Sequence, residues 1–409
     1  MPSHRIFKAL SAMALLGLAA CSPLQLGSRT LDFSNFGGNR FDNGPTNSGG
    51  MTAPTMPTSA DQRFGRGPVQ VALLLPLSGD QATASVGQSL ANASRLAIQF
   101  VEANPNIAEN ITITLRDTGT SVQGATAAAS SAVSEGAKLI LGPLRADQVT
   151  AAGSVARSAG VPLVGFSNNP VAAGPGVYLL SVLPEMEMKR SFGWLKAQGR
   201  RGIAGIFPAT EFGQAQETAF RQQAIAAGFS PNAVYTFSAP NEAQQIITQA
   251  MPQIQRGMID TLFLPDRATA PGFGAVLTQA GVTNEMVQVM GSADWEGDPA
   301  IANAPGLAGA VYPAVDPAGM MAISADYQRQ FGGQPHALAT IAYTATILAN
   351  VNTLSMANPP YNPMLMTSTQ GFNGRDGAFR FQGNGKADYA LVLKKIAPGG
   401  SQMIEGAKL

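Results

Sequence analysis

The sequence contains few charged residues, one cysteine and two histidines. Lys and Arg number 26 against 25 Asp and Glu in 409 residues, and the charged share of 12% is about half of what soluble domains average. This balance argues against a general nucleic-acid-binding protein, which needs a clustered basic surface. A single cysteine excludes a disulfide framework and any metal site built from several thiolates. With so little imidazole and thiol, the composition argues against most enzyme chemistry.

Sequence motifs of three common enzyme classes are also missing. The chain has no Ser-x-x-Lys pair, no Gly-x-Ser-x-Gly nucleophile elbow and no Gly-Lys-Ser/Thr phosphate loop. His4 lies within the first residues, and His336 lies at an expected helix start, where capping or exposure explains it. We therefore expect no catalytic activity, no cofactor and no metal ion.

The N-terminus has the pattern of a bacterial secretory signal. Arg5 and Lys8 precede the apolar run 9–20. This run is shorter than the roughly 20 residues of a membrane span. The tetrapeptide that ends at Cys21 resembles a lipobox, in which the cysteine is acylated and the preceding residues are removed. An ordinary signal peptide with a coincidental cysteine is the alternative. We expect residues 1–20 to be the signal peptide and Cys21 to carry a lipid anchor.

Residues 21–68 are expected to be the lipidated cysteine and a flexible tether. From residue 22 the segment is dominated by Gly, Ser, Thr, Asn and Pro, without helix or strand periodicity. Fully extended, it would span roughly 155–170 Å. The tether is either a dispensable spacer or a functional reach. Ser22, in place of Asp, implies transfer to the outer membrane of a Gram-negative bacterium and a periplasmic location for the rest of the chain.

From Val69 onward, strand and helix patterns alternate. Continuous apolar runs of four to eight residues are typical of strands buried on both faces of a parallel sheet. We expect strands at 69–76, 111–115, 138–141, 161–166, 203–207, 233–237, 261–264 and 287–290. We expect helices at 86–102, 122–134, from 143 to 156, and at 213–227, 242–255, 272–280 and 336–354. The pattern starts twice, which predicts two α/β lobes with ligands at the carboxyl ends of the strands.

Five short motifs occur in the order found in one protein family. They are LPLSG at 75–79, LGPL at 141–144, GVPLV at 160–164, EFGQ at 211–214 and FNGRDGAFRFQGNG at 372–385. The region from 69 to about 395 resembles the type 1 periplasmic-binding fold of the Leu/Ile/Val-binding-protein-like family. The resemblance implies two lobes, each a parallel sheet flanked by helices. It divides residues 69–405 into a first lobe of about 69–184 plus 313–358 and a second lobe of about 185–312 plus 359–405.

The resemblance places first-lobe ligand contacts on the loops that follow the strands. The candidates are Ser78, Arg145, Ala146, Asp147, Ser167 and Asn168. Loop hydroxyls and helix N-terminal amides suit an anionic group such as an amino-acid carboxylate. Turn or capping roles are the alternative for the two serines, and Arg145 and Asp147 either pair with each other or lie in solvent. Amino-acid binders of the family usually have serine where this chain has Ala146.

The second-lobe candidates also follow expected strands. They are Phe212, Asp266, Asp294 and Trp295. Trp295 is one of two tryptophans, and it either stacks on a ligand or packs at the edge of the cleft.

Two functions stay open. One is a solute-binding receptor that delivers an amino acid or amide to an ABC permease. The other is an activator of peptidoglycan synthesis, because outer-membrane lipoproteins that activate penicillin-binding proteins carry a similar domain. A receptor fixed to the outer membrane cannot diffuse to its permease, whereas a tethered regulator needs only to reach its synthase. We therefore favour the activator, with contact to the membrane through the lipid alone.

Overall fold

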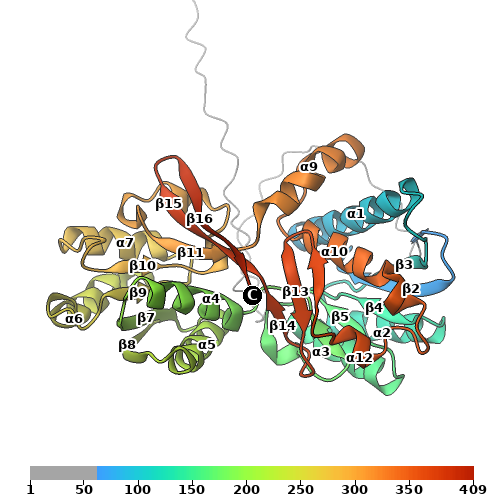
Figure 1. Cartoon of the computed structure of the whole chain (residues 1–409), viewed down its shortest axis with the longest axis horizontal. Helices are drawn as coiled ribbons and strands as arrows, with labels where there is room; N and C mark the ends of the chain where they lie inside the picture. The colour runs from blue at the N-terminus through green and yellow to red at the C-terminus, as the bar shows by residue number, and fades with distance from the viewer. Residues whose placement is uncertain (1–61) are drawn as a thin grey trace, which may run out of the picture. The chain divides into compact units, whose positions relative to one another are not determined.

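The computed structural model describes residues 62–409, apart from the side chain of Asn232 (Figure 1). The expected signal peptide, Cys21 and the tether up to residue 61 lie outside the described residues. Residues 62–409 form two large sheets with helices on their faces, and a smaller third sheet. The prediction of a two-lobed α/β fold is therefore confirmed. Within this range, no helix combines the length and the hydropathy needed to cross a membrane.

The first lobe is built on a six-stranded sheet in the order β1-β3-β2-β4-β5-β6. All neighbours are parallel except β1, which runs antiparallel to β3. Its strands are β1 (Gln62–Phe64), β2 (Val69–Leu75), β3 (Ile111–Asp117), β4 (Leu139–Leu141), β5 (Leu163–Gly165) and β6 (Val177–Leu179). Its helices are α1 (Gln81–Ala103), α2 (Val122–Ser134), α3 (Ala146–Ser158), η2 (Pro170–Ala172), α9 (Pro317–Phe331), α10 (Ala339–Asn350), α11 (Asn352–Ser355) and α12 (Pro363–Met366).

Local sequence explains how the first-lobe helices begin and what they cover. The side chain of Asp80 caps α1 by accepting the Thr83 N–H, and Ser121 caps α2 through the Gly124 N–H. The Ala-rich faces of α2 and α3 pack on one side of the sheet, because small side chains allow helices to approach it closely. α1 contacts β2, and α10 contacts β4. α9 packs on both α1 and α10.

The second lobe is built on a seven-stranded sheet in the order β16-β15-β11-β10-β9-β7-β8. Its strands are β7 (Gly202–Pro208), β8 (Ser230–Phe237), β9 (Thr261–Phe263), β10 (Gln288–Met290), β11 (Val311–Ala314), β15 (Leu391–Ala397) and β16 (Gly400–Lys408). Its helices are α4 (Pro184–Ala197), α5 (Glu211–Ala227), η3 (Pro240–Glu242), α6 (Ala243–Gln255), α7 (Ala270–Gln279), η4 (Ala293–Trp295), α8 (Pro299–Ala302) and η5 (Pro305–Leu307).

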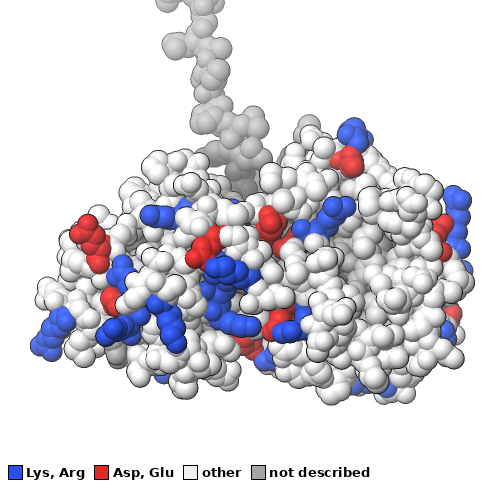
Figure 2. Space-filling view, viewed as in Figure 1, with Lys and Arg blue, Asp and Glu red and all other residues white. Residues whose placement is uncertain are grey.

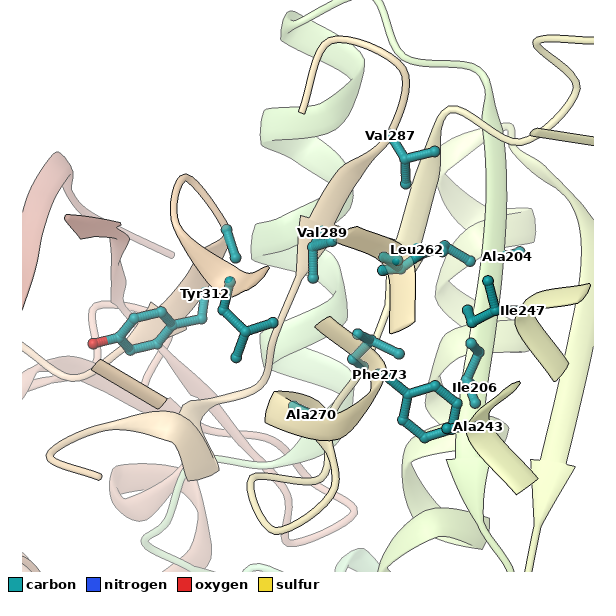
Figure 3. Packing of buried hydrophobic residues seen from close by; sticks show 14 of the residues in the cluster. Ala204, Ile206, Ala243, Ile247, Leu262, Ala270, Phe273, Val287, Val289 and Tyr312 are labelled. Atoms are coloured by element: carbon teal, nitrogen blue, oxygen red, sulfur yellow. The ribbon is translucent and has the colours of Figure 1, made fainter. Parts of the chain in front are cut away.

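Alternate residues of the second-lobe strands supply two separate cores. Ile206 and Leu262 face α6 and α7, where Ile247 and Phe273 meet them (Figure 3). The opposite face packs against α4 and α5 through an aromatic cluster, which comprises Phe192, Phe207, Phe220 and Phe263. Burial on both faces explains why these strands appear in the sequence as continuous apolar runs.

The small sheet near the C-terminus differs from the expected division of the chain. It comprises β12 (Phe372–Gly374), β13 (Gly377–Phe381) and β14 (Ala387–Tyr389). This hairpin region packs on the first lobe, since Phe381 lies 5.1 Å from the Tyr178 ring and Gly385 accepts the Leu179 N–H at 2.8 Å. The expectation had placed 359–405 in the second lobe, but within that range only β15 and β16 join the second sheet.

The start of the folded region also differs from the expectation. Residues 62–68 were expected to be tether, yet β1 pairs with β3, and the Gly67 N–H donates to the Ile111 carbonyl at 3.0 Å. A Cβ on Gly67 would lie 2.0 Å from the Asn110 carbonyl carbon, so a glycine is required there. The glycines that made this segment resemble a linker therefore serve close backbone packing.

Candidate functional site

The first-lobe candidates lie where three neighbouring strands, β2, β4 and β5, end. The loop after β2 is organised by Asp117, whose Oδ1 accepts the backbone N–H groups of Leu77 at 2.8 Å, Ser78 at 3.2 Å and Gly119 at 2.8 Å. The Ser78 side chain is exposed. Asp117 was not among the predicted site residues, although a carboxylate directly after a buried strand was the available signal.

Arg145 and Asp147 form a two-pronged ion pair. Arg145 Nε lies 3.2 Å from Asp147 Oδ1, and Arg145 Nη2 lies 3.1 Å from Asp147 Oδ2. The arginine is only 6% exposed, so this pair is more than a solvent contact. A planar guanidinium binds a ligand carboxylate through the same two donors. The protein's own carboxylate therefore occupies the Nε/Nη2 edge of Arg145, which is one of the two edges through which a guanidinium binds a carboxylate.

The other first-lobe candidates are Ser167, Asn168 and Ala146, which differ in burial and polarity. Ser167 is buried, and its Oγ accepts the Asn169 N–H at 3.1 Å, which is the turn role considered as the alternative. Asn168 is exposed. Ala146 is the first residue of α3 and carries no polar group. Of the six first-lobe candidates, Ser78, Asp147 and Asn168 are exposed and polar, and Asp147 is paired with Arg145.

The second-lobe candidates gather in the same way after β7, β9 and β10. Phe212 is half-buried in the first turn of α5. Asp266 is buried and accepts both the backbone N–H and the hydroxyl of Thr269, at 3.1 and 2.5 Å. Asp294 lies 3.8 Å from the guanidinium of Arg267. These acidic groups are engaged by neighbouring protein groups.

Trp295 packs inside the second lobe. It is 1% exposed, and its ring lies 5.9 Å from that of Tyr312. The ring covers Gly291, where an added Cβ would lie 2.3 Å from a ring atom. The structure therefore supports the packing interpretation of Trp295 and gives the ring no face for a ligand.

Glu187 is a buried group that the sequence interpretation missed. It lies in the first turn of α4, where its Oε2 accepts the Ala293 N–H at 3.1 Å and faces the Gln216 amide at 3.4 Å. Burial raises the pKa of this carboxyl to about 8, despite those two hydrogen bonds. An acid among Glu185, Lys189 and Arg190 appears in the sequence as part of a solvated helix face, so no local signal marks it.

The described surface carries few charges. Figure 2 shows scattered Lys, Arg, Asp and Glu side chains on a mostly uncharged face. No wide field of one sign is visible there, in agreement with the balanced composition.

Several solved structures share this fold. A Rhodospirillum rubrum protein classed as a branched-chain amino acid ABC transporter superposes with a TM-score of 0.72 at 20% identity, covering 82% of this chain and 99% of that chain. A Desulfitobacterium hafniense ABC transporter substrate-binding protein in complex with Leu gives 0.62 at 17%, with the same coverage. The C-domain of Haemophilus influenzae LpoA, a regulator of PBP1A, gives 0.60 at 17%, also covering 82% and 99%.

Sequence comparison gives a family but no close characterised relative. No curated protein matches the chain. The family model described as periplasmic binding protein matches residues 68–387, which is most of the chain and spans both lobes. The chain therefore belongs to the periplasmic binding protein family.

Proposed function

We propose that this protein is a non-enzymatic, lipid-anchored regulator of a peptidoglycan synthase of the penicillin-binding class. The observation that carries the proposal is the Arg145–Asp147 pair, in which the Nε and Nη2 donors of a buried arginine bind the protein's own carboxylate. Ala146 supplies no hydroxyl beside that pair, and Trp295 is buried. A site for an amino-acid carboxylate would leave these donors open.

The fold comparison and the N-terminal sequence support the same proposal. The C-domain of LpoA has this fold and is a regulator of PBP1A. In our proposal Cys21 fixes the chain to the outer membrane, and the segment up to residue 61 lets the two-lobed region reach a synthase. A regulator needs a stable surface for its partner and has no need of a ligand that exchanges.

A solute-binding receptor of an ABC transporter is the second candidate. It is favoured by the similarity to the Leu-bound protein of Desulfitobacterium hafniense. In this alternative, the exposed side chains of Ser78 and Asn168 would take part in binding a Leu-like amino acid or an amide, and the Arg145–Asp147 pair would open.

Capture from cells and ligand titration separate the two candidates. The full chain, crosslinked in its native cells and purified, should recover a peptidoglycan synthase, and adding the purified chain should increase glycan polymerisation by that synthase. Calorimetric titration with leucine, isoleucine, valine and their amides should give no saturable heat. Micromolar binding of one of these, together with recovery of an ABC permease alone, would establish the receptor instead.

The anchor has its own test. Replacing Cys21 with Ala should remove the protein from the outer-membrane fraction, because the acylated thiol is the proposed attachment. Ser22→Ala keeps the cysteine and serves as the matched control. Retention of the Cys21→Ala chain in the outer membrane would contradict the lipid anchor.

A further inference from the structure

An open cavity lies on the first lobe, apart from the predicted cleft residues. It has a volume of about 490 Å³ and is lined by residues of α1, α9, α10 and the turn between β12 and β13. None of the ten predicted cleft residues lines it. Sites for small molecules usually measure roughly 300–1,000 Å³, so the size suits an organic ligand.

Arg375 is fixed at one wall of this cavity. Its backbone N–H donates to Thr344 Oγ1 at 2.9 Å, and its Nη2 donates to the Tyr343 hydroxyl at 3.0 Å. The guanidinium carbon lies 4.7 Å from the centre of the Tyr343 ring and 5.6 Å from that of Phe100. Two aromatic rings and one hydrogen bond thus hold the cation, and a second hydrogen bond holds its backbone, so little side-chain entropy is lost when it binds an anion.

The hydrogen-bond donors at this wall outnumber the acceptors that the protein offers them. Among residues 62–409, no carboxylate lies within ion-pair distance of Arg375, and the adjacent Asp376 accepts the Thr340 hydroxyl at 2.7 Å instead. Asp326, the acid that lines the cavity, is paired with Arg329. The Tyr343 oxygen accepts from Arg375, which leaves its own O–H available to donate to another group. A guanidinium and a phenol therefore both offer donors to one anionic group.

The rest of the lining is mixed. Leu96, Phe100 and Ala103 of α1 and Ala322 and Ile323 of α9 supply apolar surface, and Gln99, Arg329 and Gln330 add polar groups. A fixed cation beside an apolar strip suits a ligand with one charged end and an apolar body. We infer that this cavity binds a small organic carboxylate with an aromatic or aliphatic body. This site contains none of the predicted cleft residues and does not depend on which proposed function is correct.

A matched pair of compounds tests the inference. We would titrate the full chain carrying Cys21→Ala, which avoids detergent, with 2-naphthoate and with the neutral 2-naphthylmethanol, and measure bound ligand by equilibrium dialysis. We expect saturable binding of one naphthoate per chain and binding of the alcohol at least tenfold weaker. Equal binding of acid and alcohol, or no saturation with naphthoate, would overturn the inference.

Variants then locate the site. Arg375→Met should weaken naphthoate binding at least tenfold, because the charge-assisted donors are lost while the apolar stem remains. Tyr343→Phe keeps the ring and deletes only the hydroxyl, so it should weaken binding about threefold and remain informative if Arg375→Met does not fold. Arg221→Met makes the same charge change on exposed α5 and should leave binding unchanged. If a folded Arg375→Met binds like the parent chain, or if Tyr343→Phe does so when Arg375→Met does not fold, the carboxylate is held elsewhere.

A protein partner is the other conceivable occupant of this cavity. If naphthoate fails to saturate while Tyr343→Phe weakens capture of a partner protein, the cavity is a docking surface and the inference is wrong.

Discussion

Glu187 on α4 accepts a hydrogen bond from the backbone N–H of Ala293, a residue 106 positions later, at 3.1 Å. Burial raises the pKa of Glu187 to about 8, so the folded protein keeps this carboxyl protonated at pH values where the unfolded chain ionises it. The neighbouring Gln216 Oε1 has no hydrogen-bond partner among the described residues. Rotating that amide would give the Glu187 proton an acceptor.

The titration of Glu187 predicts a pH dependence of stability. The stabilising contribution of its neutral form is complete below the ordinary carboxyl pKa of 4.5 and is lost as the pH rises towards about 8. Glu187→Gln should therefore flatten the decline in the free energy of unfolding between pH 5 and 8, by up to about 1.4 kcal/mol per pH unit. Urea unfolding at four pH values measures this. Glu217→Gln on α5 is the control, and equal slopes for Glu187→Gln and the parent would contradict the prediction.

Arg190 should be more important for stability than other arginines. It is buried on α4, and it donates to the Leu391 carbonyl and to Glu405 Oε2, both at 2.8 Å. Arg190→Met leaves the carbonyl and the carboxylate without this donor, so we expect a loss of about 2–4 kcal/mol in the free energy of unfolding. Arg221→Met removes only an exposed i,i+4 pair with Glu217 and should change stability by less than about 0.5 kcal/mol. Similar losses for the two variants would show that the contacts of Arg190 are not important.

Phe220 is the centre of the aromatic cluster under α4 and α5. Its ring lies 5.5 Å from those of Phe192 and Phe207 and 5.9 Å from that of Phe263. Phe220→Ala should lower the free energy of unfolding by about 3–5 kcal/mol because it leaves a cavity between packed rings. On the same helix Ile225 is 72% exposed, and Ile225→Ala should be nearly neutral. Thermal or urea unfolding compares them, and a loss below about 1 kcal/mol for Phe220→Ala would be inconsistent with this packing.

Two glycines should respond oppositely to alanine. At Gly67 a Cβ would meet the Asn110 backbone at 2.0 Å, whereas at Gly193, inside α4, nothing lies within 4 Å. Gly67→Ala should release β1 from β3 and speed amide hydrogen exchange of residues 62–64, with a loss of about 1–3 kcal/mol. Gly193→Ala should add about 0.5–1 kcal/mol of stability, because alanine favours the helix. Unchanged exchange in Gly67→Ala would mean that the segment does not pair with β3 as described.

Much of the α/β core could be predicted because its periodicity is local. The helix 122–134 was predicted with the bounds it has, and the apolar run that begins at Val69 is β2. Two edge strands, β1 and β16, were missed for physical reasons. β1 is three residues long, and β16 is almost wholly exposed, so neither needs an apolar pattern. β1 also pairs with β3, which is distant in the sequence, whereas β16 pairs with the preceding strand β15.

The placement of the candidate residues after the strands was predictable, but their bonding was not. The loops after the strands were placed correctly, because the carboxyl ends of parallel strands share one edge. The closed pair between Arg145 and Asp147 was one of two alternatives that a sequence cannot separate, since both residues have the same spacing in either case. Glu187 was missed because the groups that bury it, Gln216 and Ala293, come from other elements.

The close contact between Gly291 and the Trp295 ring also constrains how this sequence can diverge. With an added Cβ only 2.3 Å from the ring, any side chain at 291 would force the indole out of the core. A larger residue at 291 is therefore accessible only after position 295 has become smaller, whereas a smaller residue at 295 can arise first at the cost of a cavity. The two positions should change in a fixed order, and in homologues a side chain at 291 should be found without tryptophan at 295.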